Sequence, residues 1–206
     1  MRRSELSADQ ARRLDGFAAA VRQSPHNLVS RRARDELETR HIPEAVDLAR
    51  LLPHGPRRLL DVGSGGGLPG MVLAIVRPDL EVHLLDATRK KVDFLRETAA
   101  DLDLEVHVHH GRAEELARGE LTATFDLVTA RAVAPLRDLL AITLPFLTSD
   151  GALYAVKGDR WAEELAAAEE RLARLGAVVL ATPDDQGGGQ PPADGGPRVV
   201  MIGRSR

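Results

Sequence analysis

From residue 58 onward, short apolar runs alternate with segments in which apolar residues recur three and four positions apart. The short runs are typical of buried strands and the periodic segments of amphipathic helices. This alternation predicts an α/β fold built on a mostly parallel sheet. The expected strands cover 58–62, 80–86, 104–109, 125–130 and 152–157. The expected helices cover 69–77, 88–101, 113–118, 135–147 and 160–175.

The beginning of the chain follows a purely helical pattern. Residues 5–22 and 33–52 each repeat apolar positions at helical spacing, the second despite Pro43. We therefore expect an N-terminal helical extension over residues 1–56, followed by a sheet domain over 57–206.

The end of the chain departs from the alternation. Apolar runs at 177–181 and 198–202 flank the segment 184–196, which is rich in Gly, Pro and Gln. Such a composition predicts a mobile loop. Two strands joined in this way predict an antiparallel pair at the edge of the sheet.

A glycine-rich loop follows the first expected strand. The segment Leu59 to Gly70 passes from an apolar run through Asp61 into glycines and then into a new apolar stretch. Glycine allows positive φ angles and a close approach of backbone to ligand, and the amides at a helix start favour an anionic group. A second acid, Asp86, ends the next strand, where a carboxylate can accept both hydroxyls of a ribose. Together these features predict a nucleoside-cofactor pocket at the carboxyl ends of the strands.

Two cofactors fit this loop. Gly65, Gly67 and Gly70 satisfy the dinucleotide pattern G-x-G-x-x-G, which on its own is weak because glycine-rich loops are common. The frame Gly63-x-Gly65-x-Gly67, preceded by Asp61, resembles motif I of the S-adenosylmethionine (SAM) methyltransferases. A structural glycine turn is a third interpretation, but the acids on two consecutive strand ends argue against it. We favour SAM.

Composition narrows the class of protein. The 206 residues suffice for one domain and include no cysteine, so disulfides and thiolate metal sites are excluded. The first residues show no secretory signal, and no apolar run approaches the roughly 18 residues of a membrane helix. We expect a cytoplasmic protein, a monomer, with no membrane association.

Charge and histidine content add two further points. Residues 1–60 hold 12 Arg and 8 Asp or Glu, whereas the remainder holds 16 Lys or Arg and 23 Asp or Glu. The positively charged part could bind a polyanion or could be an ordinary solvated helix surface.

His107 and His109 alternate on one expected strand with His110 beside them, but zinc needs further ligands of suitable geometry, so we expect no metal site.

The ordered run of motifs resembles the RsmG/GidB family of methyltransferases. The similarity covers about residues 26–203 and departs from the family pattern at Pro43-Glu44-Ala45. The stretches that carry it are Asn27-Leu28, Arg40-His41-Ile42, Asp61 to Gly70, Leu84-Leu85-Asp86, Arg89-Lys90-Lys91, Phe94-Leu95, Gly111 to Glu115, Phe125 to Ala134 and Lys157-Gly158.

The resemblance implies a fold and a reaction. The fold would be that of a class I SAM-dependent methyltransferase, a Rossmann-like seven-stranded sheet with an antiparallel last strand, carrying the N-terminal helical extension. The reaction would be methylation of N7 of a guanosine in 16S rRNA, within the 30S subunit. A class I methyltransferase acting on another RNA or a small molecule, and a SAM-binding ribosome partner without catalysis, remain alternatives.

The resemblance also implies site residues. Arg131, Lys157 and His41 would form the catalytic mouth, although Lys157 could be a solvated strand-end lysine and His41 a core histidine. The cofactor-binding residues would be Gly63, Gly65, Leu68, Asp86, Ala113, Glu114 and Arg131. Guanine N7 carries a lone pair and no proton, so its methylation needs alignment rather than a general base. An arginine at position 131 suits that chemistry, because it cannot accept a proton from an amine but can contact guanine O6 or a phosphate.

Overall fold

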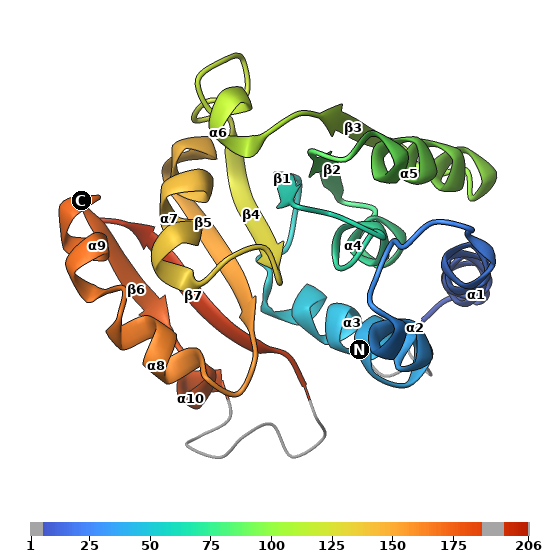
Figure 1. Cartoon of the computed structure of the whole chain (residues 1–206), viewed down its shortest axis with the longest axis horizontal. Helices are drawn as coiled ribbons and strands as arrows, with labels where there is room; N and C mark the ends of the chain where they lie inside the picture. Colours follow the sequence, from blue (N-terminus) through green and yellow to red (C-terminus); the bar gives the residue numbers. More distant parts are fainter. Residues whose placement is uncertain (1–5, 187–195, 206) are drawn as a thin grey trace.

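A seven-stranded sheet separates two layers of helices (Figure 1) in the computed structural model, which describes residues 6–186 and 196–205. The strands are β1 Arg57–Val62, β2 Leu80–Asp86, β3 Val106–His110, β4 Phe125–Arg131, β5 Leu147–Lys157, β6 Ala177–Ala181 and β7 Arg198–Arg204. The α-helices are α1 Ala8–Gln23, α2 Arg31–Asp35, α3 Ile42–Leu51, α4 Gly70–Val76, α5 Arg89–Asp101, α6 Ala113–Leu116, α7 Leu136–Thr143, α8 Trp161–Ala166, α9 Glu169–Arg174 and α10 Pro183–Gln186. A π-helix, η2 Leu37–His41, and a 3₁₀-helix, η3 Leu144–Phe146, complete the elements.

The strand order is β3-β2-β1-β4-β5-β7-β6. The first five strands pair in parallel, and β7 runs antiparallel to both β5 and β6. This topology confirms the predicted fold class. It also brings the carboxyl ends of β1, β2 and β4 to one edge of the sheet, where ligands bind in open α/β folds.

Consecutive buried residues of the central strands pack on opposite faces of the sheet. Leu59 packs into the core that includes α1, α3 and α4, whereas Leu60 packs into the core that includes α7 and α9. Leu84 and Leu85 divide in the same way. The period of two along a strand explains why these strands read as continuous apolar runs.

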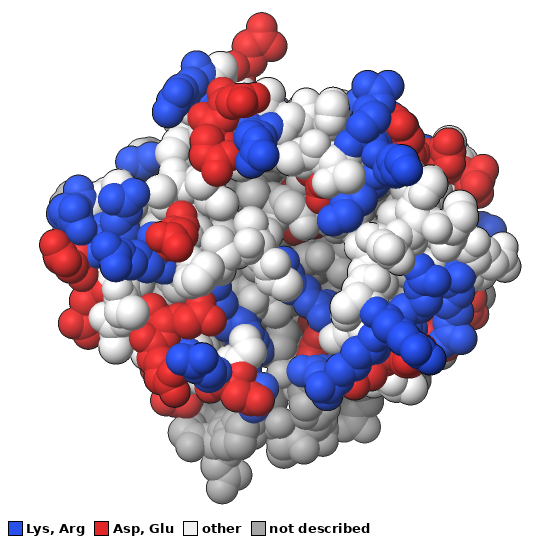
Figure 2. All heavy atoms as spheres, viewed as in Figure 1, with Lys and Arg blue, Asp and Glu red and all other residues white. Residues whose placement is uncertain are grey.

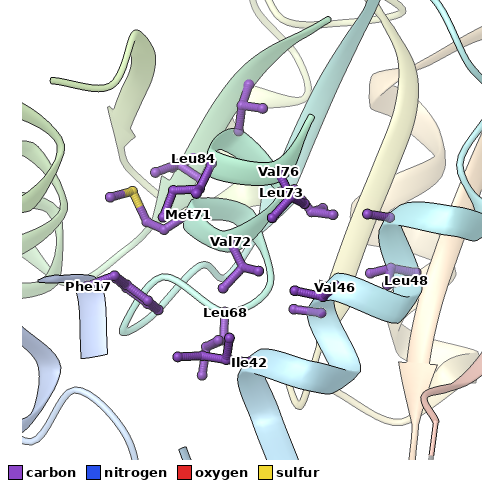
Figure 3. Close-up of a cluster of buried hydrophobic side chains, with 14 of the residues drawn as sticks. Phe17, Ile42, Val46, Leu48, Leu68, Met71, Val72, Leu73, Val76 and Leu84 are labelled. Atoms are coloured by element: carbon purple, nitrogen blue, oxygen red, sulfur yellow. The ribbon is translucent and has the colours of Figure 1, made fainter. Parts of the chain in front are cut away.

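The N-terminal helices share a core with the sheet. Phe17 of α1 and Ile42 of α3 lie beside Leu68 and Met71 of the β1–α4 region (Figure 3). The side-chain amide of Gln10 also donates to the carbonyls of the last α4 residues, at 3.3 and 3.2 Å. The extension therefore supports the loop that follows β1.

The expected helix over 33–52 is divided into three pieces. Pro43 lies in the first turn of α3, where its missing N–H leaves no helical bond unmade. The preceding turn widens into the π-helix η2, a form often found at functional sites. The division turns His41 and Glu44 toward the carboxyl end of β4.

Other expectations hold with shifted boundaries. β5 begins at Leu147, five residues before the expected start, and the expected helix 160–175 is split into α8 and α9. Of the expected loop 184–196, residues 184–186 belong to the short helix α10, so the prediction is wrong there, and residues 187–195 lie outside the described part of the chain. None of the helices in the described ranges has the length and apolar character that crossing a membrane requires.

Candidate active site

The loop after β1 turns back over the carboxyl end of β2. The amides of Gly63 and Ser64 both donate to the carbonyl of Leu85, at 2.8 and 2.9 Å. Gly63 and Gly65 adopt φ angles of 71° and 56°, which residues with a Cβ rarely adopt. A Cβ on Gly63 would lie 2.6 Å from Cγ2 of Val133. The loop therefore packs against the segment that follows β4 and requires glycine where the two meet.

Asp86 anchors this loop. Its Oδ2 accepts from the amide of Gly65 at 2.9 Å, and its Oδ1 accepts from the amide of Thr88 at 2.8 Å. A carboxylate offers about four acceptor sites, so each oxygen keeps one for a ribose hydroxyl. The amide of Gly111 donates to the Asp86 carbonyl at 3.2 Å and brings the start of α6 beside it.

The other expected cofactor residues lie in the segments that follow β1 and β3. Leu68 is a buried residue of the glycine-rich loop itself. Ala113 is half-buried and Glu114 is exposed, both in the first turn of α6. Gly63, Gly65 and Leu68 thus lie in the loop after β1, Asp86 ends β2, and Ala113 and Glu114 begin α6 after β3. A carboxylate with spare acceptors, flanked by glycines that admit a ligand, fits the ribose and methionine parts of SAM.

Asp61 is a buried carboxylate that links β1 to β4 and to the start of α4, next to the glycine-rich loop. Its side chain is fully buried, where Oδ1 accepts from the hydroxyl of Thr129 at 2.8 Å and Oδ2 from the amide of Gly70 at 3.1 Å. Burial raises the pKa of Asp61 to about 6, although these hydrogen bonds oppose the shift. Asp61 therefore joins β1, β4 and the start of α4.

Arg131 lies at the end of β4 beside residues from the N-terminal extension. Its Nη2 is 2.6 Å from Nδ1 of His41 and 3.7 Å from Oε2 of Glu44. Glu44 also accepts from Nε of Arg40 at 2.8 Å. Burial lowers the pKa of both His41 and Arg131. The result is a group of two arginines, one histidine and one carboxylate at the end of β4, in which His41 is buried, Arg131 and Glu44 are partly buried and Arg40 is exposed.

Lys157 is held inside the protein, so its expected alternative as a solvated lysine is wrong. Its Nζ donates to the carbonyl of Ala134 at 2.8 Å and lies 2.9 Å from Oε2 of Glu164. Glu164 also accepts from the amide of Leu136 at 2.8 Å. Burial alone would raise the pKa of Glu164, but the hydrogen bonds from Lys157 and the Leu136 amide, with the positive charges of Lys157 and Arg160, together lower it. Lys157 and Glu164 together fix the loop after β4.

A pocket of about 430 Å³ opens where these groups meet. Arg131 and Lys157 both line it, whereas His41 lies behind Arg131 with 4% of its surface exposed. The space-filling view shows a hollow at the middle of this face, with basic side chains at its lower border (Figure 2). Its further lining includes Arg40, Glu44, residues 132–135 and Glu164.

Sequence reasoning did not single out the two glutamates of this pocket. Glu44 belongs to the segment where the chain departs from the family pattern. Its position three residues after His41 on a helical stretch is the one local signal that predicts a contact between these two side chains. Glu164 meets Lys157 through a contact between α8 and the end of β5 that no local pattern encodes.

Solved structures share the fold. The chain superposes on a ribosomal protein methylase from Lactobacillus delbrueckii with a TM-score of 0.58 and 19% identity, covering 79% of this chain and 77% of that one. A mutant of MtNAS in complex with S-adenosylmethionine gives a TM-score of 0.63 at 16% identity, covering 95% and 73%. The sheet topology, the glycine loop and the acid at the end of β2 define a class I SAM-dependent methyltransferase.

The chain belongs to the GidB family, rRNA small subunit methyltransferase G, whose model matches residues 12–190. Relatives named ribosomal RNA small subunit methyltransferase G include those of Sorangium cellulosum, 46% identical over 76% of this chain and 66% of that protein, and Halorhodospira halophila, 44% identical over 82% and 79%. The relative from Geobacter sp. is 37% identical over 98% of this chain and 92% of its own length. The resemblance inferred from the motifs is confirmed, and with it SAM rather than a dinucleotide as the cofactor.

Proposed function

We propose that this chain transfers a methyl group from SAM to N7 of a guanosine in 16S rRNA. The observation that carries the proposal is the pocket beside the loop after β1: a partly buried arginine faces this space, and no carboxylate among the described residues that line it lacks a basic partner. Both carboxylates that line it, Glu44 and Glu164, are already paired with arginine or lysine side chains. A target atom that has a lone pair and no proton suits such a pocket.

Each residue has a part in holding the reactants. SAM, when bound, supplies an electrophilic methyl group on a sulfonium centre. Asp86 would hold its ribose, and the amides of the loop from Gly63 would lie against its methionine part. Arg131 would donate to guanine O6 or to a neighbouring phosphate, which orients N7 toward the methyl group.

The remaining residues act through Arg131 and the loop beyond it. His41 accepts from the Arg131 guanidinium and keeps it directed into the pocket. Lys157 and Glu164 hold the backbone of 134–136, which forms the opposite wall. These three are positioning residues in this proposal, because their polar atoms are engaged by the protein itself.

The substrate assignment rests on the family and on the charge of the N-terminal extension. Lys and Arg side chains gather at the lower right of Figure 2, where Figure 1 places α2. A basic surface beside the pocket would receive the phosphates that flank the target base. The proposal places the reaction on rRNA of the 30S subunit, in the cytoplasm.

Mapping of modified bases tests the function. Cells that lack the gene should lose one N7-methylguanosine from 16S rRNA, detected by mass spectrometry of digested RNA, and the wild-type gene should restore it. A gene encoding Arg131→Ala should restore little, whereas Arg137→Ala, an exposed arginine on α7, should restore it fully. Loss of N2-methylguanosine instead, or an unchanged rRNA with SAM turnover on a metabolite, would overturn the proposal.

A further inference from the structure

A group of metal-ligating side chains lies at the β3 edge of the sheet, apart from the methyltransferase site. Glu81 and His83 on β2 and His107 on β3 each offer one donor atom, and these atoms all lie within 4.8 Å of one another. The parallel register places His83 opposite His107. Because residues two apart on a strand share a face, Glu81, His83, His107 and His109 lie on the same side of the sheet edge.

The donor atoms are spaced for a metal ion. Oε1 of Glu81 lies 2.8 Å from Nε2 of His83 and 3.8 Å from Nε2 of His107. Ligand atoms of tetrahedral zinc, with bonds of about 2.0–2.1 Å, are about 3.3 Å apart. The side chains of Glu81 and His107 are 48% and 60% exposed, so they have room to make the small adjustment that remains.

His83 is the fixed member of the group. Its ring stacks on His107 at a centroid distance of 4.4 Å and meets the edge of Phe125 at 4.9 Å. Its Nδ1 lies 2.9 Å from Nε2 of His109. Metal-bound histidines commonly donate the proton of the second ring nitrogen to such a partner, which sets the ring orientation. His109 therefore stands where an orienting group is needed.

We propose that Glu81, His83 and His107 bind one divalent transition-metal ion of the zinc type, with His109 orienting His83. Two imidazoles and a carboxylate form a known zinc ligand set that leaves one position open, and the exposed face of this cluster gives that position access to solvent. The bound ion would join the edge strand β3 to β2. The sequence suggested no such site because His107 and His109 lack partners in the linear chain, and the register of β2 and β3 supplies them.

The contact between Arg58 and Glu81 allows a separate test of whether Glu81 is a metal ligand. Its Nε lies 3.2 Å from Oε1 of Glu81, and its guanidinium lies over the Phe125 ring, 5.1 Å from the centroid. A fixed positive charge beside the carboxylate opposes cation binding. Arg58→Gln should therefore bind Zn²⁺ more tightly than the wild type, provided that Glu81 is a ligand.

Titration of the chelator-treated full chain without a histidine tag tests the proposal, using Zn²⁺ in calorimetry and Co²⁺ in absorption spectroscopy. The wild type should bind one ion per chain and give the visible bands of tetrahedral Co²⁺. His107→Ala should weaken binding at least about tenfold, and His109→Ala about 10–100-fold. His110→Ala is the matched control, since His110 is exposed on the opposite face of β3, and it should bind as the wild type does.

Because Glu81 and His107 are exposed, replacing them should change metal binding without unfolding the protein. Circular dichroism and SAM binding should be the same in His107→Ala, Glu81→Gln and the wild type, because neither side chain is part of the core. Absence of tetrahedral Co²⁺ bands in the wild type would overturn the proposal. So would equal Zn²⁺ affinity in His107→Ala and His110→Ala.

Discussion

The guanidinium of Arg131 lies 2.6 Å from Nδ1 of His41, although 90 positions separate the two residues in the chain. Arginine has only donors, so Nδ1 must accept and the ring proton must sit on Nε2. Oε2 of Glu44 lies 3.1 Å from the same Nδ1 and cannot bond to it in that state. Protonation of His41 would reverse the preference, since Nδ1–H donates to Glu44 and repels Arg131.

This relationship predicts an acid limb in the pH profile of methyl transfer. Burial lowers the pKa of His41 from 6.5, and the charged groups facing the ring are Glu44, Arg131 and Arg40. The neutral ring that holds Arg131 is therefore present at neutral pH and lost as the pH falls below the ordinary histidine range. We expect kcat, measured from about pH 5 to 8, to fall at the acid end.

His41→Asn separates this effect from general acid loss of activity. The asparagine carbonyl can accept from Arg131 at any pH, so the variant should have a flatter profile. His54→Asn, at an exposed position, should keep the wild-type profile. An acid limb of equal steepness in His41→Asn and the wild type would show that His41 does not set the position of Arg131.

Arg131→Ala should reduce the rate of methyl transfer. Loss of a partly buried charged hydrogen bond costs about 1.5–3 kcal/mol, which corresponds to a decrease of about tenfold or more. The measurement is single-turnover transfer from SAM to 30S particles, with the melting temperature as a check on folding. Arg137→Ala should retain the wild-type rate, and an unchanged rate in Arg131→Ala would remove Arg131 from the site.

Gly63→Val should abolish SAM binding. The φ angle of 71° is unfavourable for valine, and even its Cβ would meet Val133 at 2.6 Å, so the loop must move away from the cofactor. Gly119→Val is a suitable control, because a Cβ there meets no atom closer than 3.7 Å. Calorimetry should give no SAM heat for the first variant and normal affinity for the second. Normal affinity in both would place the cofactor elsewhere.

Asp61 should make the stability of the protein depend on pH in an unusual direction. Because the folded-state pKa is raised from 3.8 to about 6, its contribution is full below 3.8 and is lost as the pH rises through 6. Asp61→Asn can keep both contacts, since the Thr129 hydroxyl can accept as well as donate. The stability of the variant relative to wild type should therefore increase by roughly 1.4 kcal/mol per pH unit across this window. Urea unfolding at several pH values measures it, and a constant difference would contradict the raised pKa.

The sequence predicted the sheet well because each central strand is an apolar run bounded by turn residues. The expected limits of β2 match the observed ones, and the candidate cofactor residues Gly63 and Asp86 were identifiable because each lies at the end of its own strand. The predicted helix over 33–52 was wrong as a single element. Pro43 favours the first turn of a new helix, and the tertiary contact of His41 with Arg131 accompanies the π-turn before it.

The polar contacts around the pocket could not be predicted in the same way. Glu44 pairs with Arg131, and Glu164 pairs with Lys157, across elements that no short-range period connects. Local sequence patterns can place a charged residue at a strand end, but they carry no information on which oppositely charged residue will lie beside it there. From the sequence alone, Lys157 could therefore be either a site residue or a solvated lysine at a strand end. The structure decides between them because it places Glu164 beside Lys157.

Replacement of Arg31 and Arg32 by alanine should weaken binding of 30S particles without changing SAM affinity. Both side chains are exposed at the start of α2, although Nε of Arg32 also lies 2.8 Å from Oε1 of Glu36. Arg34 and Arg40 are left unchanged, because Arg34 is partly buried and donates to the His26 carbonyl and Arg40 pairs with two glutamates. Each lost phosphate contact should reduce the slope of log affinity against log salt by roughly 0.7–0.9.

The salt dependence distinguishes this effect from an indirect one. Arg171→Ala with Arg174→Ala removes the same charge from α9, on the other side of the sheet from α2 (Figure 1), and should leave the slope unchanged. Filter binding between low and physiological salt measures both variants. A small-molecule substrate would show little salt dependence in any variant, and an equal loss of slope in the two double variants would mean that net charge, rather than contact through α2, governs RNA binding.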